Sequence, residues 1–174
     1  MAKSTKETCL TEMRGSFAEV MAIVGTIPRT RLTEPGVTDA WSVRDVLAHE
    51  SGYERWVAAA IFGDLEGRTP TQQEYYGRDD APTEADDESD DTTNAWVVAH
   101  ARTLSVDDVL TEFRWAHERL VKAVEACDEA DVVDPSRLPF TKGKTLLEIL
   151  PGQCWGHHRQ HLPQIREFAR EKAI

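Results

Sequence analysis

Three of the six histidines in this sequence are spaced as metal ligands would be. His157 and His161 are four residues apart, so on a helix their side chains lie on one face, about 6 Å from each other. Two imidazoles in that relation can chelate one divalent ion. His49 continues a different inward-facing row, that of Val46 and Tyr53. Facing histidine rows inside a helical bundle are where such proteins place metals, so the three residues form a candidate metal site.

Each of these histidines also has a simpler explanation. A single histidine on an apolar face is usually a core residue, and exposed histidine pairs on helices are common. His158 can pair with His161 at the i,i+3 spacing, although His157 fits the inward row better. Cys154, one turn before His157, is a weaker candidate ligand because buried cysteine usually behaves as a small hydrophobe. The inward row comprises Leu150, Cys154, His157, His161, Ile165 and Phe168.

Other polar residues are assigned supporting or packing roles. His100 and His117 have no histidine partner three or four positions away, which favours surface or packing roles. Pro163 lies two residues after His161 and removes a helical hydrogen bond, so a kink is expected there. Three residues near the histidines are candidates to orient the imidazoles. They are Glu50, Tyr53 and Gln153.

The elements that must position these residues are all helices. Four helix starts are indicated by a Ser or Thr followed three positions later by an acidic residue. These are Ser4, Ser42, Ser105 and Thr145. Apolar residues then recur at helical spacing to about Val24, Phe62, Cys127 and Arg170, with Gly63 ending the second helix. A further helix is expected over 93–103. Four long amphipathic helices without strands predict an all-α four-helix bundle in a single domain, residues 1–174.

A long acidic loop follows the second helix. Residues 79–91 hold eight carboxylates and no Lys or Arg. No apolar periodicity occurs between 63 and 91, so the loop over 68–91 is expected to be mobile, or ordered only by packing on the bundle. It is also the element through which an interaction module would recruit a partner.

Composition excludes several classes of protein. The net charge of −11 over 174 residues argues against a nucleic-acid partner, which requires clustered Lys and Arg. Three cysteines form no CxxC pair and no even disulfide framework, so a reducing compartment is expected. The chain has no secretory leader pattern and no apolar run of about 18 residues, which predicts no membrane partner and a cytoplasmic location.

Three stretches of the chain resemble one known group of proteins. AWSVRDVLAH, residues 40–49, is similar to the opening of the second helix in the DinB/YfiT-like superfamily. GHHRQHLPQIR, residues 156–166, resembles that superfamily's final helix, where HxxxH precedes a Gln-Ile pair. The middle, residues 94–96 and 104–110, is similar to the ClbS/DfsB branch.

The resemblance implies a four-helix bundle with a divalent metal held by His49, His157 and His161. Nickel or zinc is the first expectation, and iron and manganese are further candidates. Relatives include metal-dependent hydrolases and thiol-dependent transferases or isomerases, so a metal-dependent enzyme acting on a small molecule is the leading hypothesis. The alternatives are a non-catalytic protein that sequesters a small molecule and an interaction module. ClbS-type proteins tend to lack the histidine triad, which this chain keeps. The resemblance also implies a homodimer.

Overall fold

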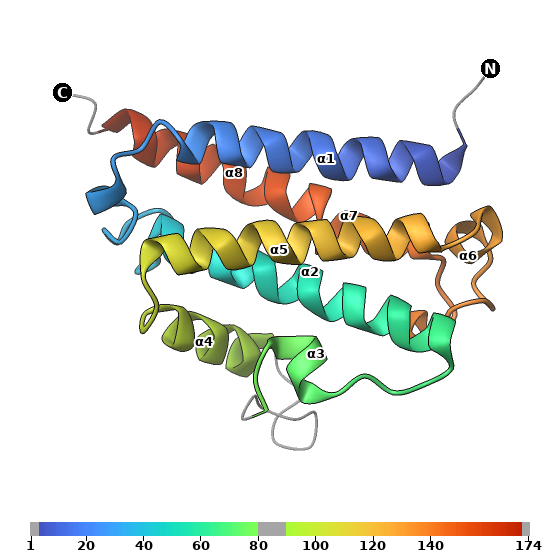
Figure 1. Ribbon diagram of the computed structural model, residues 1–174. Coiled ribbons are helices and arrows are strands. Elements are labelled where there is room, and N and C mark those ends of the chain that lie inside the picture. The colour runs from blue at the N-terminus through green and yellow to red at the C-terminus, as the bar shows by residue number, and fades with distance from the viewer. Residues whose placement is uncertain (1–3, 80–89, 172–174) are drawn as a thin grey trace.

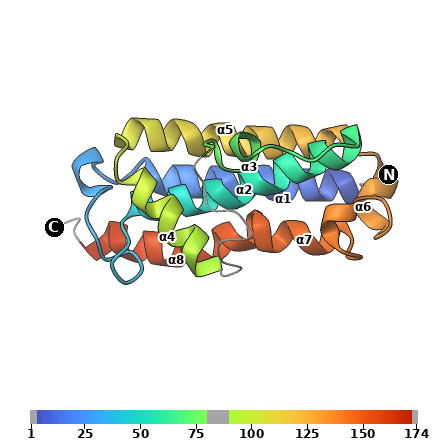
Figure 2. The ribbon, with the colours of Figure 1, turned by 90° about the horizontal axis from the view of Figure 1, so that it is seen from below.

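The fold is a bundle of four long helical rods, as seen in a computed structural model that describes residues 4–79 and 90–171. Within those ranges the regular elements are helices and no strand is present. The rods pack side by side, and the fourth is divided into two helices (Figures 1 and 2). They are α1 (Thr5–Val24), α2 (Val43–Glu66), α5 (Val106–Ala126) and the pair α7 (Leu146–Gln153) and α8 (Trp155–Glu171). The predicted all-α four-helix bundle is confirmed.

All four predicted helix starts are confirmed by capping hydrogen bonds. At each start, the Ser or Thr side chain accepts a hydrogen bond from the backbone amide of the residue three positions later. The acidic side chain of that later residue accepts one from the backbone amide of the Ser or Thr. The predicted end of α2 at Gly63 is wrong. The helix continues to Glu66 and ends at Gly67, which has a positive φ of 67°. Gly63 is needed for packing, since a Cβ there would lie 2.6 Å from Pro70.

Among the described residues, three shorter α-helices lie outside the four rods: α3 (Gln72–Tyr76), α4 (Asp90–Ala101) and α6 (Glu129–Val133). α4 corresponds to the helix expected over 93–103, whereas α3 and α6 were not predicted. α3 lies inside the predicted acidic loop and packs on α2, where the Tyr75 ring stacks with Trp56 at 5.7 Å. Residues 80–89 of that loop lie outside the described residues.

The last rod is interrupted at Cys154, a break that the sequence did not predict, and the kink expected at Pro163 stays a prediction. Cys154 has φ −145° and ψ −101°, which separates α7 from α8, and α8 runs through Pro163 to Glu171. The two helices meet closely at the break. A Cβ on Gly156 would lie 2.5 Å from the carbonyl oxygen of Pro151, a distance that no real Cβ tolerates. Glycine at 156 is therefore required for this junction.

The apolar core has two halves separated by a buried polar layer. One half includes Met13, Val57 and Leu120, and the other includes Val20 and Leu47. Each of the four rods contributes buried polar side chains between the halves. These are Ser16, His49, Glu50, Ser51, Glu54, His117, His157, His158 and His161. None of the helices in the described ranges is long and apolar enough to cross a membrane.

Candidate metal centre

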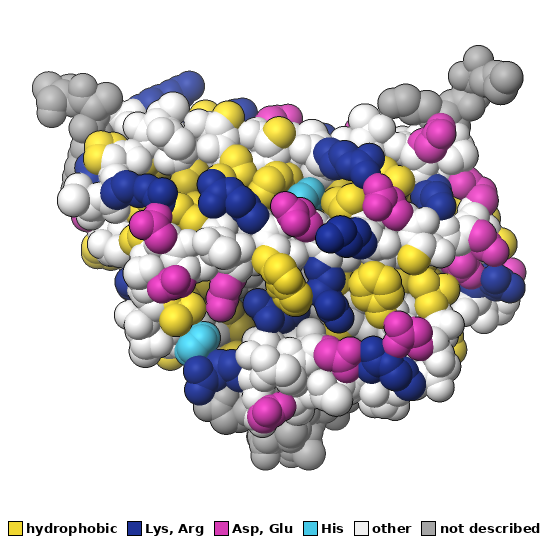
Figure 3. Space-filling model, viewed as in Figure 1, with side chains coloured by type: hydrophobic (Ala, Val, Ile, Leu, Met, Phe, Trp, Pro, Cys, Tyr) yellow, Lys and Arg dark blue, Asp and Glu magenta, His cyan; other side chains and the backbone are white. Residues whose placement is uncertain are grey.

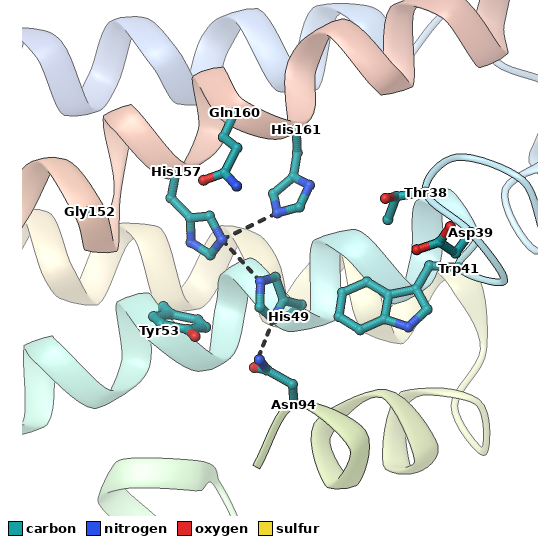
Figure 4. Close-up of a pocket in the computed structure, with 10 residues that line it drawn as sticks. All are labelled: Thr38, Asp39, Trp41, His49, Tyr53, Asn94, Gly152, His157, Gln160 and His161. Carbon is teal, nitrogen blue, oxygen red and sulfur yellow. Dashed lines mark hydrogen bonds between the residues drawn. The ribbon is translucent and has the colours of Figure 1, made fainter. Parts of the chain in front are cut away.

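The three histidines singled out by spacing meet in one place. His49 comes from α2, and His157 and His161 come from consecutive turns of α8, so that the rings point toward one another (Figure 4). His157 Nε2 lies 3.0 Å from His49 Nε2 and 3.2 Å from His161 Nε2. All three side chains are buried. We call these three residues the pocket triad.

The nitrogen positions fit a single metal ion. Metal–nitrogen bonds of 2.0–2.1 Å at tetrahedral angles place two ligand nitrogens about 3.3 Å apart. The observed separations of 3.0 and 3.2 Å need adjustments of only a few tenths of an ångström. The third pair of ligand atoms, from His49 and His161, lies within 4.8 Å, so a divalent ion could be held by the pocket triad after adjustment of the rings.

Two side-chain amides fix the orientation of the outer rings. Asn94 Oδ1 lies 3.0 Å from His49 Nδ1, and Gln164 Oε1 lies 3.1 Å from His161 Nδ1. Gln164 is itself oriented, because its Nε2 donates to Thr38 Oγ1 at 3.4 Å. An amide oxygen can only accept, so each Nδ1 carries the proton and each Nε2 presents a lone pair. Ligating histidines are usually held by such hydrogen bonds.

Both of these lone pairs point at the same atom, His157 Nε2. That nitrogen carries at most one proton and so cannot satisfy both neighbours by hydrogen bonding. A cation between the three nitrogens would satisfy all of them. The donor set also fits, because neutral imidazole is a ligand for zinc, nickel and iron.

The rings are neutral at physiological pH. Burial is the main cause, and it lowers the pKa of His49 to about 4 and that of His157 to about 3, with the neighbouring histidines adding to both shifts. Burial likewise lowers the pKa of His161, against the hydrogen bond to Gln164. Only a neutral imidazole can bind a metal, so the pocket triad is ready to ligate at pH 7.

The pocket triad forms one wall of a pocket of about 560 Å³. Trp41 and Tyr53 each pack against the His49 ring in a T-shaped arrangement, at centroid distances of 5.0 and 4.9 Å. The rest of the lining is mostly polar. The lining residues are Thr38, Asp39, Trp41, His49, Tyr53, Asn94, Gly152, His157, Gln160 and His161 (Figure 4). A metal at the triad would therefore face a space large enough for a small molecule.

The residues predicted to orient the triad were only partly the right ones. Tyr53 contacts His49 and also His157, at a centroid distance of 4.8 Å. Glu50 is buried elsewhere, beside Glu54 and His158, and burial raises its pKa to about 8. Gln153 does not line the pocket. The hydrogen bonds come instead from Asn94 and Gln164, which sequence reasoning missed. Gln164 follows His161 by three residues, a spacing that could have identified it.

Cys154 and His158 turn away from the pocket triad. The Cys154 thiol donates to Glu54 Oε1 at 2.9 Å, and His158 Nε2 lies 3.2 Å from the same oxygen. The surface or packing role expected for His117 leaves out a polar contact, because its Nδ1 lies 3.1 Å from Glu54 Oε1. We call Glu54, His117, Cys154 and His158 the buried cluster. His100, by contrast, stacks on Trp96 near the surface.

Comparison with known proteins identifies related sequences and folds. Residues 13–160 match the model of the mycothiol maleylpyruvate isomerase N-terminal domain, a range that contains His49 and His157 and ends just before His161. No curated protein matches the chain. An uncharacterised protein from Escherichia coli UTI89 has a TM-score of 0.77 at 15% identity, covering 99% of this chain and 97% of its own. A protein from Streptococcus pneumoniae has a TM-score of 0.80 at 10% identity, covering 100% and 94%.

A third similar structure bears on the expectation of no nucleic-acid partner. It is the colibactin self-resistance protein ClbS, crystallised with double-stranded DNA, with a TM-score of 0.74 at 11% identity. The alignment covers 100% of this chain and 99% of that one. The likeness shows a shared fold. On the visible face of this molecule, Lys and Arg are interspersed with Asp and Glu (Figure 3). The absence of a nucleic-acid partner remains a prediction.

Proposed function

From the membership of this chain in the mycothiol maleylpyruvate isomerase N-terminal domain family, within the DinB/YfiT-like superfamily, we propose that it is a metal-dependent enzyme acting on a small molecule. One observation carries the proposal. Three Nε2 atoms converge at the wall of an open pocket, and two of the rings are held by amide oxygens behind them. Three protein ligands beside a pocket, which leave a coordination position open, are typical of catalytic rather than structural metal sites.

His49, His157 and His161 would hold the ion, with nickel or zinc as the first candidates. A bound divalent ion supplies Lewis acidity, which polarises a carbonyl or lowers the pKa of a bound water or thiol. Three protein ligands leave a coordination position open, and a fourth protein ligand is not supplied by Cys154, whose thiol faces Glu54. This arrangement favours chemistry over a purely structural role.

The residues around the triad determine what can bind. Trp41 and Tyr53 offer flat apolar surfaces, while Thr38, Gln160 and Asn94 offer hydrogen-bonding groups. The ligand therefore combines an apolar part with a few polar atoms. The family description favours a thiol-dependent transfer or isomerisation as the reaction. Hydrolysis is the second candidate.

The competing hypothesis is a binding protein that sequesters a small molecule without turnover. The two hypotheses differ in a measurable way, because an enzyme converts many equivalents of substrate and a sequestering protein at most one.

We also propose that the chain forms a homodimer. Light scattering at tens of micromolar protein tests this.

The test is a screen of the metal-loaded protein with small thiols paired with unsaturated carbonyl compounds, and separately with ester and amide substrates. We expect multiple turnovers that disappear on chelation and in His161→Ala, while His100→Ala stays active. Stoichiometric consumption without turnover would support sequestration. Activity that persists in the chelated protein would contradict the proposal.

A further inference from the structure

The buried cluster brings four potential metal ligands together away from the pocket. Glu54 comes from α2, His117 from α5, Cys154 from the break between α7 and α8, and His158 from α8. One ligand atom from each lies within 4.8 Å of every other. None of the four residues is more than 4% exposed. The cluster thus joins three of the four rods in the polar layer.

The atoms are spaced nearly as the ligands of one ion would be. Glu54 Oε1 lies 3.1 Å from His117 Nδ1, 3.2 Å from His158 Nε2 and 2.9 Å from Cys154 Sγ. A tetrahedral zinc ion with ordinary bond lengths places its ligand atoms roughly 3.3 to 3.6 Å apart. These three separations would have to grow by a few tenths of an ångström, and the remaining pairs, which lie within 4.8 Å of one another, would have to close to the same range.

A hydrogen bond behind His158 orients its ring as it would in a metal site. Ser16 Oγ lies 2.9 Å from His158 Nδ1 and 3.0 Å from the Met13 carbonyl oxygen. When the single hydroxyl proton is donated to Met13, Ser16 accepts from Nδ1–H of His158. The Nε2 lone pair then faces Glu54 Oε1, off the axis of a hydrogen bond. This matches the arrangement around ligating histidines, in which the distal nitrogen is held by a neighbour.

Hydrogen bonding within the cluster leaves polar atoms unsatisfied. Among the described residues, Glu54 Oε2 and His117 Nε2 have no hydrogen-bond partner, and both residues are buried. Glu54 is a carboxylate that lies fully buried in the core. Such a group is costly to bury unless its charge is compensated.

A divalent ion would balance the charge of this set. One carboxylate, one thiolate and two neutral imidazoles carry two negative charges in total, so the complex with a dication is neutral. Sulfur, nitrogen and oxygen donors are all ligands for zinc, and four protein ligands close the coordination shell as in structural zinc sites. The pocket triad differs in both respects, having three nitrogen donors and an adjoining pocket.

We propose that Glu54, His117, Cys154 and His158 form a second, structural metal site that binds zinc. The site is independent of the pocket triad and of the enzymatic function proposed for it. Because the ligands come from three rods and flank the helix break, the ion fixes the α7–α8 junction against α2 and α5. It has no open position for substrate, and its role is to stabilise the bundle.

Cobalt reconstitution tests the proposal directly. The full-length protein is unfolded in the presence of a chelator, which removes bound metal, and is then refolded with Co²⁺. Protein-bound Co²⁺ has absorption bands that are diagnostic of thiolate ligation and of tetrahedral geometry. We expect two Co²⁺ per wild-type chain and one in His161→Ala, with the thiolate band retained. In the double variant carrying Cys154→Ser with His161→Ala, we expect the thiolate band to be lost and affinity to fall at least tenfold. Zn²⁺ should displace Co²⁺ from the site in His161→Ala.

Matched controls separate ligation from packing. Cys127 is also a buried thiol, but it hydrogen-bonds to the Ala123 carbonyl outside the cluster, so Cys127→Ser should keep the thiolate band. Cys154→Ser nearly preserves side-chain size, and circular dichroism and urea unfolding of the metal-free form report whether it folds. If folded His161→Ala binds no Co²⁺, or binds it without a thiolate band, the proposal is overturned. The buried cluster is then a metal-free hydrogen-bond network.

Discussion

His157 and His158 are consecutive in the sequence, yet their rings belong to different clusters. His157 Nε2 lies 3.0 Å from His49 Nε2 beside the pocket, whereas His158 Nε2 lies 3.2 Å from Glu54 Oε1 in the core. Successive residues on an α-helix differ by about 100° in direction, which is enough to turn one ring toward the pocket and the other toward α1 and α5. The rotation of α8 about its axis therefore determines the positions of the α8 side chains in both clusters, and the junction at Cys154 fixes that rotation.

Removal of one triad ligand should remove one metal ion. We predict that His161→Ala lowers the metal content by one ion per chain, because two histidines hold a divalent ion far more weakly than three. The helical circular dichroism should be unchanged, since the side chain lies beside a pocket rather than in a packed apolar core. Elemental analysis of the purified protein measures the loss, with His100→Ala as the control. Unchanged metal content in His161→Ala would refute the assignment of the triad.

The amide that orients His49 should contribute to metal affinity without touching the metal. Asn94→Ala removes the oxygen that lies 3.0 Å from His49 Nδ1, and we expect about 10- to 100-fold weaker binding at the pocket triad. Asn94→Asp keeps an acceptor oxygen at that place and should retain most of the affinity. Competition with a chromophoric chelator measures both variants, and equal affinities of wild type and Asn94→Ala would show that the contact has no effect.

The fold could be predicted because its signals are local. Each of the four rods begins with a capping side chain and continues as an apolar row, and both features are read from neighbouring residues. The same kind of signal marked the two short helices that were missed, since Thr71 with Glu74 and Asp128 with Asp131 form equivalent caps. The break at Cys154 could not be predicted this way. It depends on the approach of the Pro151 carbonyl to Gly156, a contact between two helices.

The two clusters show what spacing can and cannot reveal. His157 and His161 are found by their i,i+4 relation, and the structure brings His49 to them. The buried cluster has no such relation, because Glu54, His117 and Cys154 come from different segments of the chain. His117 was assigned a surface or packing role because no second histidine lies three or four positions from it. Its partner is the carboxylate of Glu54 on α2. The two side chains meet only because α5 packs on α2, a contact that sequence spacing does not reveal.

The stability of the metal-free protein should fall as the pH is lowered. Folding lowers the pKa of His157 from 6.5 to about 3, mainly through burial, so below pH 6.5 the unfolded chain binds a proton that the folded one does not. This destabilises the fold by about 2 kcal/mol between pH 7 and pH 5. His49 acts in the same direction, whereas Glu50, whose pKa is raised to about 8, acts in the opposite one. Urea unfolding at both pH values should show a smaller loss in His157→Asn than in wild type or His100→Asn. Equal losses in all three would contradict the prediction.

Double-stranded DNA should not bind this protein appreciably, although ClbS was crystallised with it. The net charge of −11 repels a polyanion, and the Lys and Arg side chains on the face shown in Figure 3 are mixed with acidic ones, so we expect few counterions to be released on contact. We expect a dissociation constant weaker than about 100 µM for a short duplex at about 0.15 M salt, which is at or beyond the weak end of non-specific binding. Fluorescence anisotropy measures it. Tighter binding that weakens steeply with added salt would mean that basic residues are grouped on a surface in a way that the net charge conceals.

The junction between α7 and α8 should be sensitive to a single methyl group. A Cβ at Gly156 would lie 2.5 Å from the Pro151 carbonyl oxygen, so Gly156→Ala forces the two helices apart. We expect a loss of about 1–3 kcal/mol in the free energy of unfolding, in the range of overpacking substitutions. Gly152→Ala is the matched control, because nothing lies within 4 Å of its Cβ and alanine favours a helix by up to about 1 kcal/mol. Both clusters depend on the rotation of α8, so Gly156→Ala should also weaken metal binding by the pocket triad, while Gly152→Ala leaves it intact. Urea unfolding and metal titration of the two variants test this, and similar results for both would show that the junction does not control the position of the histidines.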